Sequence, residues 1–288
     1  MKITEIIKKR KSCRTYIQKP LSPSDKKALE DFISENSKCI DDENINLFIM
    51  EKGVQDKKIT LDYGVIKGHN TYILGISKDD PASRLNYGYL MEKLVLKATE
   101  LGLSTCWIGY FDHDYFNDLN IEKGFVIPGL VVIGYAEENT TLPERFLRFT
   151  ANATKRLPWD KLFFDYQSKT PLTPESTPLT TETIKNYSDS LEMVRLAPSS
   201  SNSQPWRIYF DGPANEFHFF KKPKNRIYEN MGMHELDLGI AMAHFELTSL
   251  SNGLKGSWIC HTAGDTTPTG NNIPVADDLQ YMISWRCK

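Results

Sequence analysis

Two short segments of the sequence concentrate side chains that bind anions and other polar ligands. Arg10, Lys11, Ser12 and Arg14 stand close together near the start of the chain. Arginine offers a fixed fork of donors and lysine a point charge, so such a cluster suits a phosphate or another anion. A solvated basic surface is the commoner role of such a cluster and stays open as the alternative. The second segment, 197–206, reads Ala-Pro-Ser-Ser-Ser-Asn-Ser-Gln-Pro-Trp and offers hydroxyl and amide groups.

The serine-rich segment is expected to form a binding loop held at both ends. Pro198 and Pro205 fix their own φ angles and bias the residues before them away from helical geometry. The helix that the pattern predicts over Ile184–Leu196 therefore ends at the loop. Trp206–Phe210 follows directly as an apolar run typical of a strand. A loop between a helix and a strand keeps its polar groups in place, although a plain connection remains the alternative reading of such a composition.

Other candidate side chains carry weaker signals. Lys155 and Arg156 form a second pair of neighbouring cations, before Leu-Pro-Trp. The histidines are scattered along the sequence, and each is expected to be structural rather than a catalytic base. The 5 cysteines are an odd number without a Cys-x-x-Cys motif, so neither a disulfide framework nor a metal site is expected.

The elements that must position these segments follow from hydrophobic periodicity and from turn residues. The pattern predicts helices over Ile3–Lys9, from Ser22 or Ser24 as N-cap to Ile33, over Tyr87–Leu101 with Gly102 at its end, and over Leu236–Leu250. It predicts strands over Asn46–Glu51, Thr71–Ser77, Val126–Tyr135, Trp206–Phe210 and Gln280–Trp285, and the run Leu103–Gly109 directly follows the helix over Tyr87–Leu101.

Composition narrows the class of protein. The chain has 288 residues, of which 40% are hydrophobic and 25% charged, as in an ordinary globular protein of one large or two moderate domains. A net charge of −2 gives no general attraction to nucleic acid. No segment resembles a signal peptide or a membrane span, so we expect a cytoplasmic protein without a membrane or nucleic-acid partner.

An internal repeat is visible in the sequence. Leu101-Gly102-Leu103 is followed after three residues by Trp107-Ile108, and Asn252-Gly253-Leu254 is followed after three residues by Trp258-Ile259. A long predicted helix precedes the motif in both places, and the predicted helix starts at 22–33 and 180–191 occur in the same order. We therefore predict two diverged copies of one fold, with residues 1–166 as the first half, 167–183 as a linker and 184–288 as the second half.

The two copies differ in complementary ways. The basic cluster at 10–14 has no counterpart near the linker, and the serine-rich loop has no counterpart near residues 34–44. If the halves associate like the subunits of a two-fold dimer, each half keeps what the other lacks. One of two ancestral sites would then survive, in a chain that we expect to be a monomer.

These motifs together resemble the flavin-dependent nitroreductase family, and in particular its single-chain, internally duplicated, TM nitroreductase-like branch. The cluster at 10–14 is similar to the family's Arg-Arg-Ser-x-Arg, with Lys11 where arginine is usual. The loop at 197–206 is similar to the family's loop almost letter for letter, and the Gly-Leu-Ser-Thr-Cys-Trp-Ile-Gly run at 102–109 and the basic pair at 155–156 add to the resemblance.

The resemblance implies an α+β nitroreductase-like fold and an FMN cofactor. The residues that it assigns to FMN are Arg10, Lys11, Ser12, Arg14, Lys155 and Arg156 for the phosphate and ribityl end, Pro198, Ser199, Ser200 and Asn202 for the polar contacts of the other half, and the backbone of Trp107, Ile108 and Gly109 beside the ring.

The implied reaction is a ping-pong hydride transfer from NAD(P)H to the flavin and on to a nitroaromatic, a quinone or a related small-molecule acceptor. No catalytic side chain is assigned, because the cofactor carries the redox chemistry. A flavin-binding protein without turnover is the alternative. A serine hydrolase ranks far lower, since the sequence has no Gly-x-Ser-x-Gly elbow.

Overall fold

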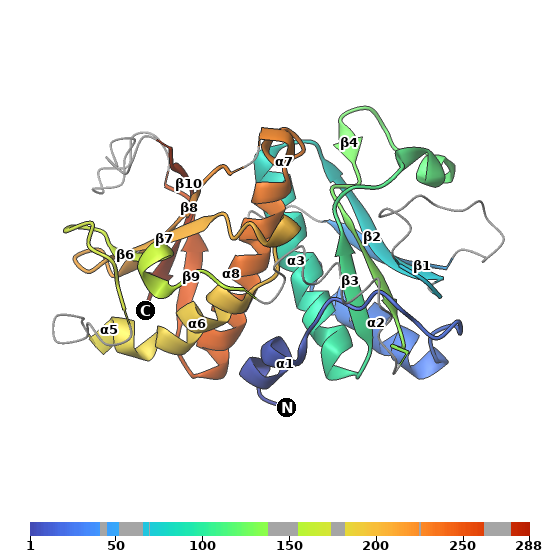
Figure 1. Ribbon diagram of the computed structural model, residues 1–288, viewed down its shortest axis with the longest axis horizontal. Helices are drawn as coiled ribbons and strands as arrows, with labels where there is room; N and C mark the ends of the chain where they lie inside the picture. Colours follow the sequence, from blue (N-terminus) through green and yellow to red (C-terminus); the bar gives the residue numbers. More distant parts are fainter. Residues whose placement is uncertain are drawn as a thin grey trace. The chain divides into compact units, whose positions relative to one another are not determined.

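The computed structural model divides the chain into two compact units (Figure 1). The first unit holds residues 5–154 with Met1, and the second holds residues 155–288 with residues 2–4. The structure describes residues 1–40, 45–51, 66–68, 70–137, 155–173, 182–224, 226–261 and 278–288. Within these ranges no helix is both long and apolar enough to cross a membrane.

The first unit is an antiparallel sheet with flanking helices. Its sheet runs in the order β1-β2-β5-β3, and β4 pairs with β2. In chain order its elements are α1 (Ile3–Lys9, of which residues 5–9 belong to this unit), α2 (Pro23–Glu35), β1 (Asn46–Glu51), β2 (Thr71–Lys78), α3 (Pro81–Glu100), β3 (Ser104–Ile108), β4 (Phe125–Val126) and β5 (Leu130–Gly134).

Two helices of this unit begin at polar N-caps followed by proline. Ser22 caps α2 as predicted, because its Oγ accepts the N–H of Asp25 at 3.1 Å. The start of α3 differs from the prediction at Tyr87, since Asp80 caps the helix and Pro81 opens it. The first turn of α3, Pro-Ala-Ser-Arg, carries no apolar periodicity, which is why the pattern placed the start too late.

The strand predicted over Val126–Tyr135 is interrupted in the structure. β4 ends at Val126 and β5 begins at Leu130. Pro128 lies between them and has no N–H to donate to a neighbouring strand, so it ends the pairing.

The second unit repeats this architecture. Its sheet runs in the order β6-β7-β8-β10-β9, where only the β6–β7 pair is parallel. Its elements are β6 (Phe163–Asp165), α5 (Glu182–Asn186), α6 (Ser188–Leu196), β7 (Trp206–Asp211), β8 (Glu216–Lys221), α7 (Arg226–Asn230), α8 (Met233–Ser251), β9 (Gly256–Ile259) and β10 (Gln280–Cys287).

The predicted helix over Ile184–Leu196 is broken at Tyr187. This buried residue lies between α5 and α6 and has ψ near 4°. Its ring stacks on Phe245 of α8, with centroids 5.5 Å apart, and its hydroxyl donates to the Lys255 carbonyl at 3.1 Å. The helix is thus interrupted where Tyr187 contacts residues that are distant in the sequence. The hydrophobic periodicity of residues 184–196 does not reveal this interruption.

Aromatic packing forms the core of the second unit. Phe245 of α8 lies against Phe217, Phe219 and Trp285 of the sheet, with ring centroids 5.2, 5.4 and 5.9 Å away. All four side chains are fully buried. Because side chains alternate along a strand, Glu216 and His218 of β8 face away from α8.

The two units share one chain order and one sheet order. Each contains a helix, two strands, a long helix and two further strands, namely α2-β1-β2-α3-β3-β5 and α6-β7-β8-α8-β9-β10. In each sheet the strands lie in the order first, second, fourth and third, all antiparallel. The chain is therefore an α+β protein of two tandem copies, with β4 and β6 as additions.

The ends of the two long helices also match in detail. Gly102 has φ 81° and Gly253 has φ 78°. The N–H of Leu103 donates to the Ala98 carbonyl at 2.9 Å, and the N–H of Leu254 donates to the Ser249 carbonyl at 3.0 Å. Both helices thus end in a Schellman motif, in which the residue after the helix has left-handed backbone geometry and is usually glycine.

The units divide at residues 154/155, earlier in the chain than the boundary expected at 166. Residues 155–166 belong to the second unit because β6 pairs with β7. Residues 167–173 of the expected linker follow β6, and Pro171 forms a bridge with Phe164. Residues 174–181 of that linker lie outside the described residues.

Candidate functional site

The N-terminal basic segment lies beside β3 in the first unit. Ser12 forms a parallel bridge with Thr105, and the N–H of Cys13 donates to the Thr105 carbonyl at 2.9 Å. The structure therefore brings the segment Arg10–Arg14 alongside the strand that carries Trp107 and Ile108. These two predicted groups are distant in sequence and neighbours in the fold.

The cations of this segment differ in exposure. Lys11 is exposed, whereas Arg10 and Arg14 are partly buried. Nη1 of Arg14 is buried and has no hydrogen-bond partner within the described residues. A buried charged donor without an acceptor is costly. An anionic oxygen at this position would remove the cost, so the donor set suits a phosphate group.

The side chain of Trp107 is hydrogen-bonded to helix α3. Its indole N–H donates to Oε2 of Glu92 at 2.8 Å, and Glu92 is fully buried on α3. Gly109 follows the strand directly, and the next residue, Tyr110, is 65% exposed. The end of β3 thus carries an indole hydrogen-bonded to α3 and, three residues later, an exposed tyrosine.

The serine-rich loop between α6 and β7 has a strained backbone. Ser201, Asn202 and Gln204 have φ of 48°, 54° and 48°. Left-handed geometry is uncommon outside glycine and asparagine, and it persists only where surrounding contacts enforce it. One such contact is the Gln204 N–H, which donates to Ser199 Oγ at 2.9 Å.

The carboxylate of Asp237 on α8 accepts hydrogen bonds from the serine-rich loop. Its Oδ1 accepts the N–H of Ser200 at 2.8 Å and the hydroxyl of Ser200 at 3.2 Å, and its Oδ2 accepts the Ser203 hydroxyl at 3.2 Å. Burial raises the pKa of Asp237 to about 7, although the serine donors act in the opposite direction. Sequence reasoning missed this residue. Its only signal in the sequence was a charged residue between Leu236 and Leu238 at the start of a predicted helix.

The basic pair at 155–156 is bound to the same loop. Nη1 of Arg156 donates to Oδ1 of Asn202 at 3.0 Å, and its Nη2 donates to the Leu196 carbonyl at 3.2 Å. The amide of Asn202 donates in turn to the Lys155 carbonyl at 2.7 Å. Both ends of the Asn202 amide are therefore engaged within the second unit, where they position the loop and the guanidinium.

The predicted site residues thus form two groups. The first unit holds Arg10, Lys11, Ser12 and Arg14 beside Trp107, Ile108 and Gly109, and the second unit holds Lys155 and Arg156 beside Pro198, Ser199, Ser200 and Asn202. Their assignment to FMN stays a prediction.

Comparison with known sequences settles the family. Residues 2–249 match the family described as "Putative TM nitroreductase". The chain belongs to this nitroreductase family. The resemblance inferred from the sequence motifs is confirmed, as is the α+β fold.

A nitroreductase structure that covers nearly the whole chain shows the same fold. A structure of a "putative nitroreductase" from Thermotoga maritima aligns with 99% of this chain and 93% of its own, at 19% identity and a TM-score of 0.60. A nitroreductase family protein from Clostridium difficile aligns with 56% of this chain and 96% of its own, at 20% identity and a TM-score of 0.42.

A nitroreductase from Bacteroides fragilis, solved with bound FMN, aligns with 49% of this chain and 92% of its own, at 19% identity and a TM-score of 0.40. No curated protein matches the sequence.

Proposed function

We propose that the chain is an FMN-dependent oxidoreductase of the nitroreductase type. Its membership of the nitroreductase family supports this proposal. The observation that carries it is the buried Nη1 of Arg14, which lacks an acceptor among the described residues and stands in a basic segment fixed on β3. When bound, FMN would accept hydride from NADH or NADPH and reduce a nitroaromatic, a quinone or a related acceptor.

The first group of residues would bind the phosphate. Arg10 and Arg14 offer forked, permanently charged donors, Ser12 adds a hydroxyl, and Lys11 adds a solvated charge. The bridge between Ser12 and Thr105 fixes the backbone of the segment, so little conformational freedom is lost when an anion binds.

The second group would supply directed polar contacts to the cofactor. Asp237 and Asn202 hold the backbone of the loop in its left-handed conformation. Ser199 and Ser200 then lie at defined positions, although both hydroxyls also serve the loop itself. No side chain is proposed as a general acid or base.

Purification followed by visible spectroscopy tests the proposal. We expect a yellow protein that releases FMN on heating and oxidises NADH or NADPH in the presence of a nitroaromatic or a quinone. A colourless protein that takes up no added FMN would refute it. Bound FMN without oxidation of either nicotinamide with any acceptor would favour the flavin-binding protein without turnover.

A further inference from the structure

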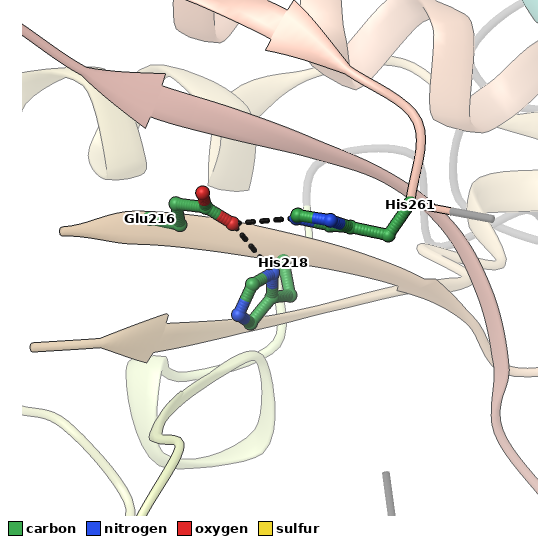
Figure 2. Close-up of side chains that lie close together, drawn as sticks. All are labelled: Glu216, His218 and His261. Atoms are coloured by element: carbon green, nitrogen blue, oxygen red, sulfur yellow. Dashed lines mark hydrogen bonds and ion pairs between the residues drawn. The ribbon is translucent and has the colours of Figure 1, made fainter. Parts of the chain in front are cut away.

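A second cluster of reactive side chains lies on the face of the second sheet that points away from α8. Glu216 and His218 stand two residues apart on β8 and therefore share a face. Ser284 lies opposite His218 on β10, and Arg286 lies opposite Glu216. His261 follows the end of β9 and reaches the same place, as Figure 2 shows.

The geometry of three of these side chains suits a metal ion. One ligand atom each from Glu216, His218 and His261 lies within 4.8 Å of the others. Oε2 of Glu216 is 2.7 Å from Nε2 of His261 and 3.8 Å from Nδ1 of His218. Zinc–ligand bonds of about 2.0 to 2.1 Å place tetrahedral ligands roughly 3.3 Å apart. Small side-chain movements would therefore admit an ion.

A buried carboxylate lies next to one of the histidines. Oδ2 of Asp211 lies 3.7 Å from Nε2 of His218, and both atoms are buried without a hydrogen-bond partner in the part of the chain that the structure describes. Metal-binding histidines commonly direct their other ring nitrogen to a carboxylate. A proton on Nε2 would leave the lone pair of Nδ1 directed at Glu216 and at the Ser284 hydroxyl, 2.7 Å away.

The balance of charge also favours a cation. Asp211 and Glu216 are buried carboxylates, with side chains 0% and 2% exposed. Arg286 donates to the second oxygen of Glu216 at 2.7 Å, but its side chain is 47% exposed. The ammonium of Lys169 lies over the ring of Tyr166, 3.8 Å from the centroid. It interacts electrostatically with Asp165 and Asp211, but it forms no ion pair within 4.0 Å among the described residues. A divalent ion would offset the remaining negative charge.

The same residues contain a Ser284–His218–Asp211 series that is similar to a hydrolase triad. Ser284 is fully buried within β10, and its Oγ also contacts the hydroxyl of Tyr281 at 2.8 Å. A nucleophile must reach its substrate. The buried position of Ser284 therefore favours a structural role over acyl transfer.

We propose that Glu216, His218 and His261 bind one divalent transition-metal ion of the zinc class. Two imidazole nitrogens and a carboxylate are a donor set that zinc accepts. The cluster lies at the Asp211 end of β7, whereas the serine-rich loop joins the Trp206 end, about 16 Å along the strand. The ion would fasten β8 to the chain that leaves β9, and the proposal does not depend on flavin chemistry.

The test uses untagged, full-length protein freed of metal by a chelator. Titration with Zn²⁺ alone should show one high-affinity ion per chain, raise the unfolding temperature, and give a four-coordinate absorption spectrum when Co²⁺ replaces Zn²⁺. His261→Gln and Glu216→Gln should each weaken Zn²⁺ binding at least tenfold. Glu216→Gln retains the shape of the side chain, and His261 follows an edge strand, so at least one variant should fold.

Two matched variants serve as controls. Tyr281→Phe removes a hydroxyl from the same network without removing a ligand, and Cys260→Ser removes the exposed thiol beside His261. Both should bind Zn²⁺ as the unaltered protein does. Absence of stoichiometric Zn²⁺ binding would overturn the proposal. Equal affinity in folded His261→Gln and Glu216→Gln, or loss of affinity in Cys260→Ser, would also overturn it.

Discussion

Asp237 connects the buried interior of the second unit to the strained serine-rich loop. Burying a carboxylate to 2% exposure normally costs folding free energy. Here three donors from Ser200 and Ser203 bind its oxygens and lower that cost. The loop gains an anchor, and the helix gains hydrogen-bond partners for a polar group in an apolar environment. The cost of this arrangement depends on whether the carboxyl group is ionised.

Asp237→Asn should reduce the pH dependence of folding stability. Burial raises the pKa of Asp237 to about 7, so the folded state retains a proton that the unfolded state releases near pH 4. The stabilisation from this group is complete below about pH 4 and is lost as pH rises to about 7. Urea unfolding at several pH values measures both proteins. The free energy of unfolding of the unaltered protein, relative to that of Asp237→Asn, should fall by up to about 4 kcal/mol over that window.

The asparagine side chain retains an oxygen for the Ser200 N–H and places an amide near the Ser203 hydroxyl, which accepts hydrogen bonds. The variant should therefore fold. A stability difference that stays constant from pH 4 to pH 8 would contradict the raised pKa.

Arg14→Ala should weaken FMN binding by about 1.5 to 3 kcal/mol, the range for a lost hydrogen bond to a charged group. The reason is the buried Nη1, whose acceptor would be the cofactor phosphate. Fluorescence titration with FMN measures the change, and Arg14→Lys should be intermediate because it keeps the charge and loses the fork.

Lys9→Ala is the matched control for this prediction, because Lys9 is an exposed cation at the end of α1. Its FMN affinity should equal that of the unaltered protein. If Arg14→Ala also retains full affinity while remaining folded, the basic segment does not bind the phosphate.

At the level of elements, the duplication allows the same substitution to be made at the ends of both long helices, α3 and α8. A Cβ added to Gly102 or Gly253 would meet no atom within 4 Å, so only the left-handed backbone resists substitution. Gly102→Ala and Gly253→Ala should therefore each cost about 1 to 2 kcal/mol of folding stability. Thermal or urea unfolding measures both values.

Gly256→Ala is a contrast at a nearby position, because its Cβ would lie 2.3 Å from the ring of Trp285. This variant should be markedly less stable than the other two. A cost near zero at Gly102 or Gly253 would mean that the Schellman ends do not constrain the helices.

Elements with strong local patterns were predictable from sequence. The apolar run at Asn46–Glu51 and the helix at Ile3–Lys9 have the predicted bounds. The breaks at Pro128 and Tyr187 were missed for different reasons. Proline was visible in the sequence but was outweighed by the apolar run around it, whereas Tyr187 lies at a break accompanied by contacts with α8 and with Lys255.

The candidate site was predictable only where one segment carries the whole signal. The segments at 10–14 and 198–202 were visible as clusters of donors. Asp237 was not, because its partners come from a loop that is remote in sequence. The Glu216–His218–His261 cluster was equally hidden, since the pairing of β8 with β10 and of β10 with β9 brings its members together.

For the whole molecule, each copy keeps a binding segment that the other copy lacks. This predicts one FMN per chain and a monomer. The basic segment precedes α2 in the first copy, and the serine-rich loop precedes β7 in the second. Heat release of flavin against protein concentration gives the ratio, and sedimentation gives the mass. Two FMN molecules per chain would show that both ancestral sites persist, and a stable dimer would contradict the expectation of a monomer.

The short strand β6 determines where the second copy can be cut from the chain. It lies before the helices of the second copy, yet it pairs with β7, every residue of which is buried. A fragment that begins at residue 184 would lack this cover and would expose a row of unpaired backbone groups, which templates aggregation. The second copy can therefore be separated only together with the stretch from residue 155.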